Sequence, residues 1–194
     1  MIIYLYFPIE NKKVDTISLE IEMDFEILSG AETKLLDGKV NLAITPFISE
    51  HSKIEVDKLC DIRVIPAVAS KVFKNKRPQL KELLALPQII VKDGMGKQIG
   101  SSFAEHSESS KWVVSDHHIK RELIINGLGW GHLEETSISK ELQSKAMTEI
   151  KLKGLSAKSM PLYLARSYQQ TQGPVSHDLW GYIVEHFKDK KLKR

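Results

Sequence analysis

The sequence predicts an α/β protein with a largely parallel sheet, and two observations support that class. Short apolar runs of strand length alternate with amphipathic segments of helix length, which is the order that βαβ units produce. Twice, at residues 35–44 and 123–133, a helical segment ends at a glycine and leads directly into a buried strand. With 194 residues and 42% hydrophobic content, the chain can bury a core as one domain or as two small lobes.

The first part of the chain predicts two strands with a helix between them. Residues 16–25 alternate apolar and polar side chains, which is the period of a strand with one buried face. The pattern Ser29-x-x-Glu32 is a capping box that would start a helix, and Gly38 would end it in a left-handed conformation. Residues 40–44 then form an apolar run, which predicts a buried strand ended by Pro46.

Prolines divide the next part of the chain. Residues 63–72 predict a strand that contains Pro66, and because proline lacks a backbone donor, we expect this strand to lie at a sheet edge or to bend. Pro78 would open a short helix that Pro87 ends. Residues 88–91 predict the strand that follows.

A second helix-to-strand unit lies in the middle of the chain. Residues 112–114 predict a strand, and Asp116 is placed to cap a helix that Gly127 closes. Residues 130–133 predict the strand after it.

The last part of the chain predicts two strands and a final helix. The strands are expected at residues 150–152 and 161–165. The helix would begin near Ser176 and bury one apolar side chain per turn, at Leu179, Ile183 and Phe187.

Composition limits the class of protein. The net charge of +3 comes mainly from residues 188–194, which favours a solvated chain end over a DNA contact. Cys60 is the single cysteine, so an internal disulfide is excluded, and we expect it to be a small buried apolar residue. The apolar residues 1–8 lack a basic leader and a cleavage site and are too short to span a bilayer, which predicts a cytoplasmic protein.

Two glycine motifs suggest nucleotide binding, but neither fits it. Gly127, Gly129 and Gly131 close a helix and precede a strand, whereas a dinucleotide fingerprint follows a strand and opens a helix. The loop 94–97 follows a strand, but it lacks the spacing and the hydroxyl residue of a P-loop. This loop could either line a ligand cleft or be an ordinary surface loop.

The histidines do not predict a metal site. His117 and His118 are adjacent and therefore diverge, and no carboxylate or cysteine is spaced to complete a site with His106 or His132. We retain a ligand contact for His117, because exposed N–H groups at a helix start favour anions. No triad, paired-carboxylate or thiol motif predicts enzyme activity, and no cofactor is predicted.

The two helix-to-strand motifs resemble the effector-binding domain of LysR-type transcriptional regulators. The specific pieces are Leu28–Ala31 running into Leu36–Ile44, and Asn126–Leu133. Members of that family commonly carry aspartate at the position of Asn41 and proline at that of Glu134. The resemblance extends from the first predicted strand to the last helix.

This resemblance implies the two-lobed fold of type 2 periplasmic binding proteins, with two crossover strands near residues 66–68 and 162–163. Lobe I would comprise residues 1–66 plus 163–194, and lobe II residues 67–162. A small effector, either anionic or aromatic, would bind between the lobes, and closure would change how dimers pair. The expected ligand-binding residues are Thr45, Pro46, Phe47, Ala67, Gly94, Met95, Gly96, Lys97, Ser115, Asp116 and His117.

The resemblance further implies a homodimer or higher homo-oligomer that makes no membrane contact and senses its ligand without transforming it. No helix-turn-helix precedes Met1 in this sequence, so we expect DNA contacts only through a domain that the chain lacks. Two alternatives stay open: a stand-alone solute-binding protein of the same fold, and an enzyme on that fold, such as a dehydratase or a transferase.

Overall fold

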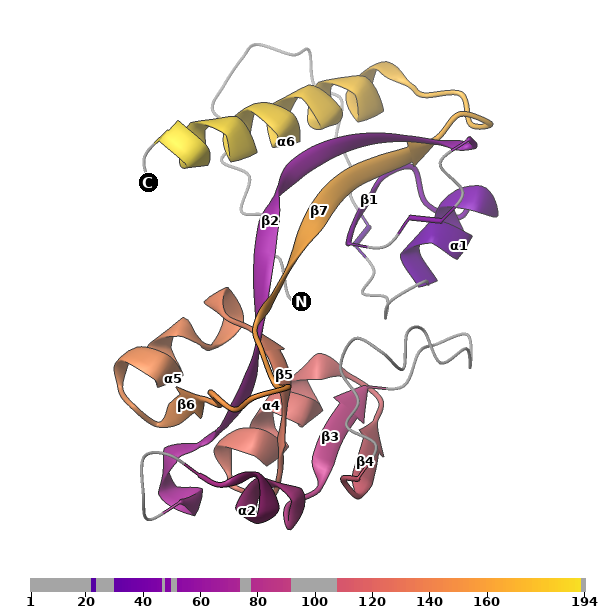
Figure 1. Cartoon of the computed structure of the whole chain (residues 1–194). Helices are drawn as coiled ribbons and strands as arrows, with labels where there is room; N and C mark the ends of the chain where they lie inside the picture. Colours follow the sequence, from indigo (N-terminus) through magenta and orange to yellow (C-terminus); the bar gives the residue numbers. More distant parts are fainter. Residues whose placement is uncertain are drawn as a thin grey trace.

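The computed structural model describes residues 22–23, 30–46, 48–49, 52–73, 78–91 and 108–192. Their helices and strands form two groups that are joined by two long strands lying side by side, β2 (Ile54–Ala69) and β7 (Lys158–Ser167) (Figure 1). We name these groups lobe I and lobe II.

Each lobe combines strands with covering helices. Lobe I contains α1 (Gly30–Leu36), β1 (Ala43–Thr45) and α6 (Pro174–Leu192) beside the first half of β2 and the second half of β7. The helices of lobe II are α2 (Leu80–Leu84), α4 (His117–Ile125), α5 (Ser139–Gln143) and the 3₁₀ helices Ser70–Val72 and Thr136–Ile138. Its strands are β3 (Gln88–Val91), β4 (Lys111–Val114), β5 (Trp130–Glu134) and β6 (Met147–Glu149).

The sheet runs through both lobes in the order β1-β7-β2-β5-β3-β4, with β6 paired to β2. Only β3 makes parallel pairs, with β4 and with β5, among the strands that the structure describes. The other pairs are antiparallel, so the prediction of a largely parallel sheet is wrong for this part of the chain. The physical reason is that β2 and β7 cross between the lobes in opposite directions and pair with each other.

Pro66 lies in the interior of the sheet, opposite His132. Of the two possibilities that the sequence left open, a sheet edge or a bend, the edge is therefore wrong. The pairing of β2 with β7 ends at Val64, and its pairing with β6 begins at Ala67. The N–H of Ile150 donates to the Pro66 carbonyl at 2.7 Å. The nitrogen and the carbonyl of one strand residue point to the same side of the strand, so the Pro66 nitrogen also faces this side. The missing N–H donor therefore lies at the point where β2 changes its partner from β7 to β6.

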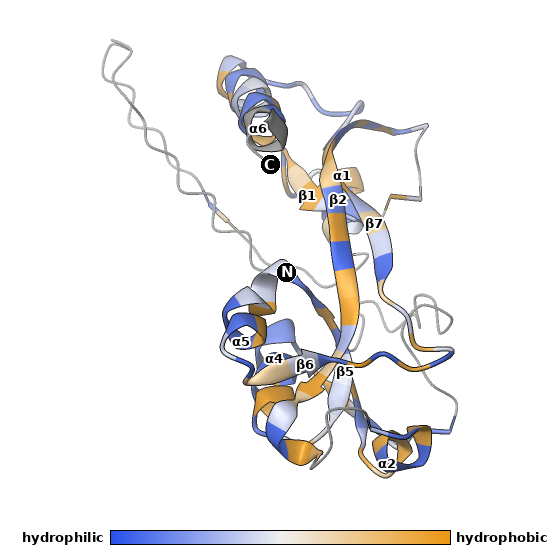
Figure 2. Cartoon of the chain, turned by 60° about the vertical axis from the view of Figure 1, so that its left-hand side comes forward, coloured by the Kyte–Doolittle hydropathy of each residue, from blue (hydrophilic) through white to orange (hydrophobic). Residues whose placement is uncertain are grey.

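Alternate side chains of the crossover strands enter different cores. In β7, Leu164 packs with Trp180 under α6, whereas Ala165 packs with Leu35 of α1. In β2, Ala67 packs with Ile124 of α4, whereas its neighbour Val68 packs on the α2 side of the sheet. Both faces of the sheet are therefore covered in each lobe, and hydropathy alternates along β2 (Figure 2).

Local signals predicted several elements correctly. β3 has the predicted bounds, Gly38 and Gly127 have φ values of 74° and 81°, and α6 begins at Pro174, close to the predicted start. On α6, Ile183 is buried, and Leu179 and Phe187 pack against the same cluster.

Other elements differ from the prediction. β2 begins at Ile54 rather than at residue 63, and β6 ends at Glu149, where the prediction placed a strand at residues 150–152. Cys60 is only partly buried. The predicted strand at residues 16–25 and the capping residue Ser29 lie outside the described residues, except for 22 and 23, which are not in a strand; Met23 is 61% exposed.

Candidate functional site

The strand register defines the end of lobe II that faces lobe I. β5 runs antiparallel to β2 and ends at Glu134, opposite Val64, where β2 crosses between the lobes. β3 and β4 run parallel to β5, so the carboxyl ends of these three strands lie at the same end of the lobe. In open α/β sheets, ligands bind outside the carboxyl ends of parallel strands, so this end is the candidate site.

The start of α4 brings three predicted site residues to this end. Asp116 caps the helix, because its Oδ1 accepts a hydrogen bond from the Ile119 N–H at 2.8 Å. That hydrogen bond is the main reason that the pKa of Asp116 is lowered. Ser115 donates to the same carboxylate at 3.4 Å, and His117 is the exposed first residue of the helix. The predicted cap is confirmed.

The other described candidates lie in different surroundings. Thr45 ends β1 in lobe I opposite Tyr163, is 2% exposed, and is followed by Pro46. Ala67 is fully buried in the core of lobe II, where its neighbours in the sheet are Gly131 and Glu149. Two groups of candidates, Phe47 and the loop 94–97, lie outside the described residues.

Lys120 also lies in this region, although the sequence did not predict it as a site residue. It lies in the first turn of α4, yet it is only 5% exposed, because its stem passes Gly131 of β5. Burial lowers the pKa of Lys120 to about 8. The signal available in the sequence was its spacing of four residues from Ile124, which places both side chains on the sheet-facing side of the helix.

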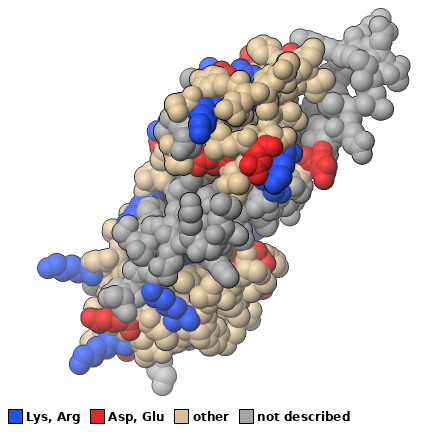
Figure 3. Space-filling view, turned by 90° about the vertical axis from the view of Figure 1, so that its right-hand side faces the viewer, with Lys and Arg blue, Asp and Glu red and all other residues tan. Residues whose placement is uncertain are grey.

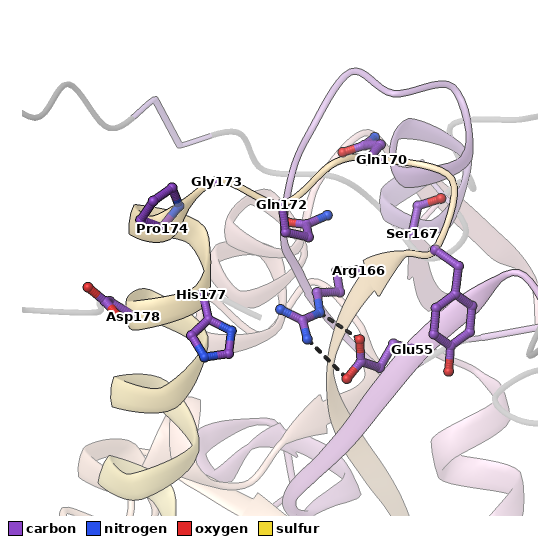
Figure 4. Close-up of a pocket in the computed structure, with 10 residues that line it drawn as sticks. Glu55, Arg166, Ser167, Gln170, Gln172, Gly173, Pro174, His177 and Asp178 are labelled. Carbon is purple, nitrogen blue, oxygen red and sulfur yellow. Dashed lines mark hydrogen bonds and ion pairs between the residues drawn. The ribbon is translucent and has the colours of Figure 1, made fainter.

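A pocket of about 490 Å³ lies in lobe I, at the junction of β7 and α6 (Figure 4). Arg166 donates to both carboxylate oxygens of Glu55, at 2.7 and 3.1 Å, and its guanidinium lies 4.4 Å from the centre of a Trp180 ring. The indole N–H of Trp180 donates to Asp57 at 2.9 Å. Because the guanidinium is already paired and stacked, this pocket offers a ligand no free cation at Arg166.

The described side chains on one face of the molecule do not form the basic patch that is typical of nucleic-acid binding. On the face shown in Figure 3, basic and acidic side chains are interspersed rather than gathered into one basic patch. Within the described ranges, no three His, Cys, Asp or Glu side chains group as metal ligands. Among the described helices, none combines the length and the apolar character that a membrane span requires.

Two α/β lobes joined by two crossover strands, with strand ends facing across the junction, define a ligand-binding domain of the periplasmic-binding-protein type. A model of the family described as the LysR substrate binding domain matches residues 18–188. The chain therefore belongs to that family, whose members are domains of transcriptional regulators. The resemblance inferred from the sequence is confirmed.

Solved structures of LysR-type regulators share the fold. The regulatory domain of HypT from Salmonella typhimurium has a TM-score of 0.64 at 18% identity, over 82% of this chain and 78% of that one. The CrgA regulatory domain from Neisseria meningitidis has a TM-score of 0.62 at 18% identity, over 79% of this chain and 78% of the CrgA domain. Full-length LysG from Corynebacterium glutamicum gives 0.62 at 17% identity, over 90% of this chain but only 59% of LysG. No curated protein sequence matches the chain.

Proposed function

We propose that this chain is the effector-binding and oligomerisation domain of a LysR-type regulator. It would bind a small molecule between the lobes and so modulate DNA binding by a helix-turn-helix domain outside this sequence. The observation that carries the proposal is the family match over residues 18–188 together with two lobes joined by β2 and β7. Among the similar structures, LysG is described with bound effector arginine and a HypT domain with bromide ion.

The arrangement of β2 and β7 supports closure of the lobes around a ligand. These two strands pair side by side where the chain passes between the lobes, and β2 changes partners at Pro66. A small change in backbone angles at such a point can rotate one lobe against the other. We place the boundary so that lobe I holds residues 1–66 and 163–194 and lobe II holds 67–162.

The proposed ligand contacts come from both lobes. Lobe I would supply Thr45, Pro46 and Phe47, and lobe II the loop 94–97 and the start of α4 at residues 115–117, with Ala67 at the hinge. We further propose that the protein is a cytoplasmic homo-oligomer and that it binds its ligand without converting it chemically. The family match supports a sensing role, since the similar structures are regulatory domains of LysR-type regulators.

A thermal-shift screen with small carboxylates, amino acids and aromatic acids tests the proposal. Saturable binding at one hundred times Kd would stabilise the domain by about 2.7 kcal/mol. Light scattering should show a dimer or larger species, and chromatography of the incubated ligand should recover it unaltered. A monomer that binds nothing in the screen would contradict the proposal, and turnover of a bound compound would favour an enzyme instead.

A further inference from the structure

Lys120 occupies an unusual place for a lysine. Its side chain is only 5% exposed, although it lies in the first turn of α4, at the end of lobe II that faces lobe I. A Cβ added to Gly131 would lie 3.1 Å from the Lys120 Cε and 3.2 Å from the Ile124 Cδ1. The stem of Lys120 therefore lies between the helix and β5, in the space that a glycine leaves.

The ammonium group of Lys120 has no partner among the described residues. Its pKa is lowered by burial alone, with no hydrogen bond or opposite charge to raise it. Asp116, one turn earlier, directs its carboxylate to the Ile119 N–H. Arg121, the next residue, is paired with Glu122 and Glu141. A largely buried lysine without a counter-charge destabilises the folded state, and an anion bound beside its ammonium group would relieve that cost.

The direction of the side chain places this charge at the candidate site. Side chains of an α-helix lean toward its N-terminus, and the N-terminus of α4 lies at the carboxyl ends of β3 and β4. The positive end of the helix adds to the attraction for an anion there. The cap already uses the Ile119 N–H, so the ammonium rather than the backbone would be the main donor.

We propose that Lys120 binds the anionic group of the effector, so that the effector is a small molecule carrying a carboxylate or a similar oxyanion. This inference rests on the proposed function and narrows it to one ligand class. The ammonium would donate charge-assisted hydrogen bonds to the anion, and the anion would supply the missing counter-charge.

The test measures the pKa of Lys120 in the whole chain by NMR of ¹³C-labelled lysine, assigned with Lys120→Met. The probes are sodium benzoate and sodium sulfate up to about 100 mM, with benzamide as the uncharged analogue and sodium chloride at matched ionic strength. An opposite charge within hydrogen-bonding distance should raise this pKa by about 1 or more. The inference is overturned if neither anion raises the pKa, or if chloride raises it as much.

Calorimetric titration with benzoate and sulfate supplies the second readout. Lys120→Met should weaken anion binding at least about tenfold, whereas Lys140→Met, at an exposed position of α5, should leave it unchanged. Equal binding by Lys120→Met and the unmodified chain would overturn the inference. If Lys120→Met fails to fold, Lys120→Arg, which keeps a positive charge but removes the labelled lysine, provides the NMR assignment, and the pKa measurement on the unmodified chain still decides. If the thermal-shift screen finds an uncharged compound that binds Lys120→Met and the unmodified chain equally, the role of Lys120 is refuted, whereas the proposed function is not.

Discussion

Replacing Lys120 with methionine should stabilise the ligand-free domain. Methionine has a similar length and no charge, so it can keep the packing of the stem against Gly131 and Ile124 while removing the buried ammonium. The pKa of Lys120 is lowered from 10.5 to about 8, a difference that corresponds to about 3 kcal/mol. Because the side chain is only 5% exposed, solvent screening reduces this figure little.

The same pKa predicts how the effect depends on pH. Below about pH 8 both the folded and the unfolded chain carry the proton on Lys120, so the full cost of burying the charge is present. As the pH rises from about 8 toward 10.5, the folded state loses this proton first, and the cost disappears. The advantage of Lys120→Met should therefore be largest at pH 7 and shrink steadily up to pH 10.

Urea unfolding of the two proteins at pH 7, 8, 9 and 10 measures this difference. Lys140→Met, at an exposed position in the same lobe, serves as the control and should follow the unmodified chain at every pH. A methionine variant that is less stable than the unmodified chain at pH 7, or an advantage that stays constant to pH 10, would refute the reasoning about the buried ammonium.

Three further predictions follow from named contacts. Gly129→Ala should lower the free energy of unfolding by about 2 kcal/mol, because a Cβ there would lie 2.5 Å from the Pro87 carbonyl oxygen. Gly181→Ala in α6, where an added Cβ would meet no other atom within 4 Å, should instead raise the free energy of unfolding by about 0.5–1 kcal/mol. Urea unfolding that ranks the two variants alike would contradict the close packing of Gly129 against Pro87. Asp116→Ala should lower the thermal midpoint at pH 7 while Asp116→Asn retains most of it, since asparagine also caps helices. The difference between Asp116→Ala and the unmodified chain should shrink as the pH falls through the lowered pKa of Asp116, and equal midpoints at pH 7 would argue against the cap. Glu55→Gln, in the lobe I pocket, should leave benzoate affinity unchanged in calorimetry, and loss of binding would move the effector site to that pocket.

Local sequence signals predicted the elements whose boundaries depend on neighbouring residues. The Asp116 cap and the left-handed Gly127 are both short-range effects, and together they fix the two ends of the α4 unit. β3 was predicted with its observed bounds because an apolar run of strand length follows Pro87 directly.

Pairings between distant parts of the chain could not be predicted in the same way. Glu55 and Arg166 are 111 residues apart, and only the antiparallel pairing of β2 with β7 brings them together. The alternation of strands with helices favoured a largely parallel sheet, because βαβ units produce that order. It gives no sign that β2 and β7 cross between the lobes and pair with each other. For Pro66 the sequence left an edge position or a bend open, because a change of partner within one strand leaves no mark in the sequence.

In the candidate site, too, the sequence predicted short-range features but not those that depend on distant parts of the chain. The start of α4 was predicted from its cap, whereas Lys120 was overlooked because a lysine between polar and apolar helix residues normally reaches solvent. Its burial depends on the small size of Gly131 in a strand that follows later in the chain. All of the expected ligand contacts remain predictions, and of these Phe47 and the loop 94–97 also lie outside the described residues.

Backbone-amide NMR during a titration with benzoate, and with any ligand found in the thermal-shift screen, tests most directly whether a small molecule binds between the lobes. We predict saturable shift changes at Thr45 in lobe I and at Ser115–His117 in lobe II, with one common affinity. Changes confined to one lobe, or centred on Glu55 and Arg166, would contradict an interlobe site.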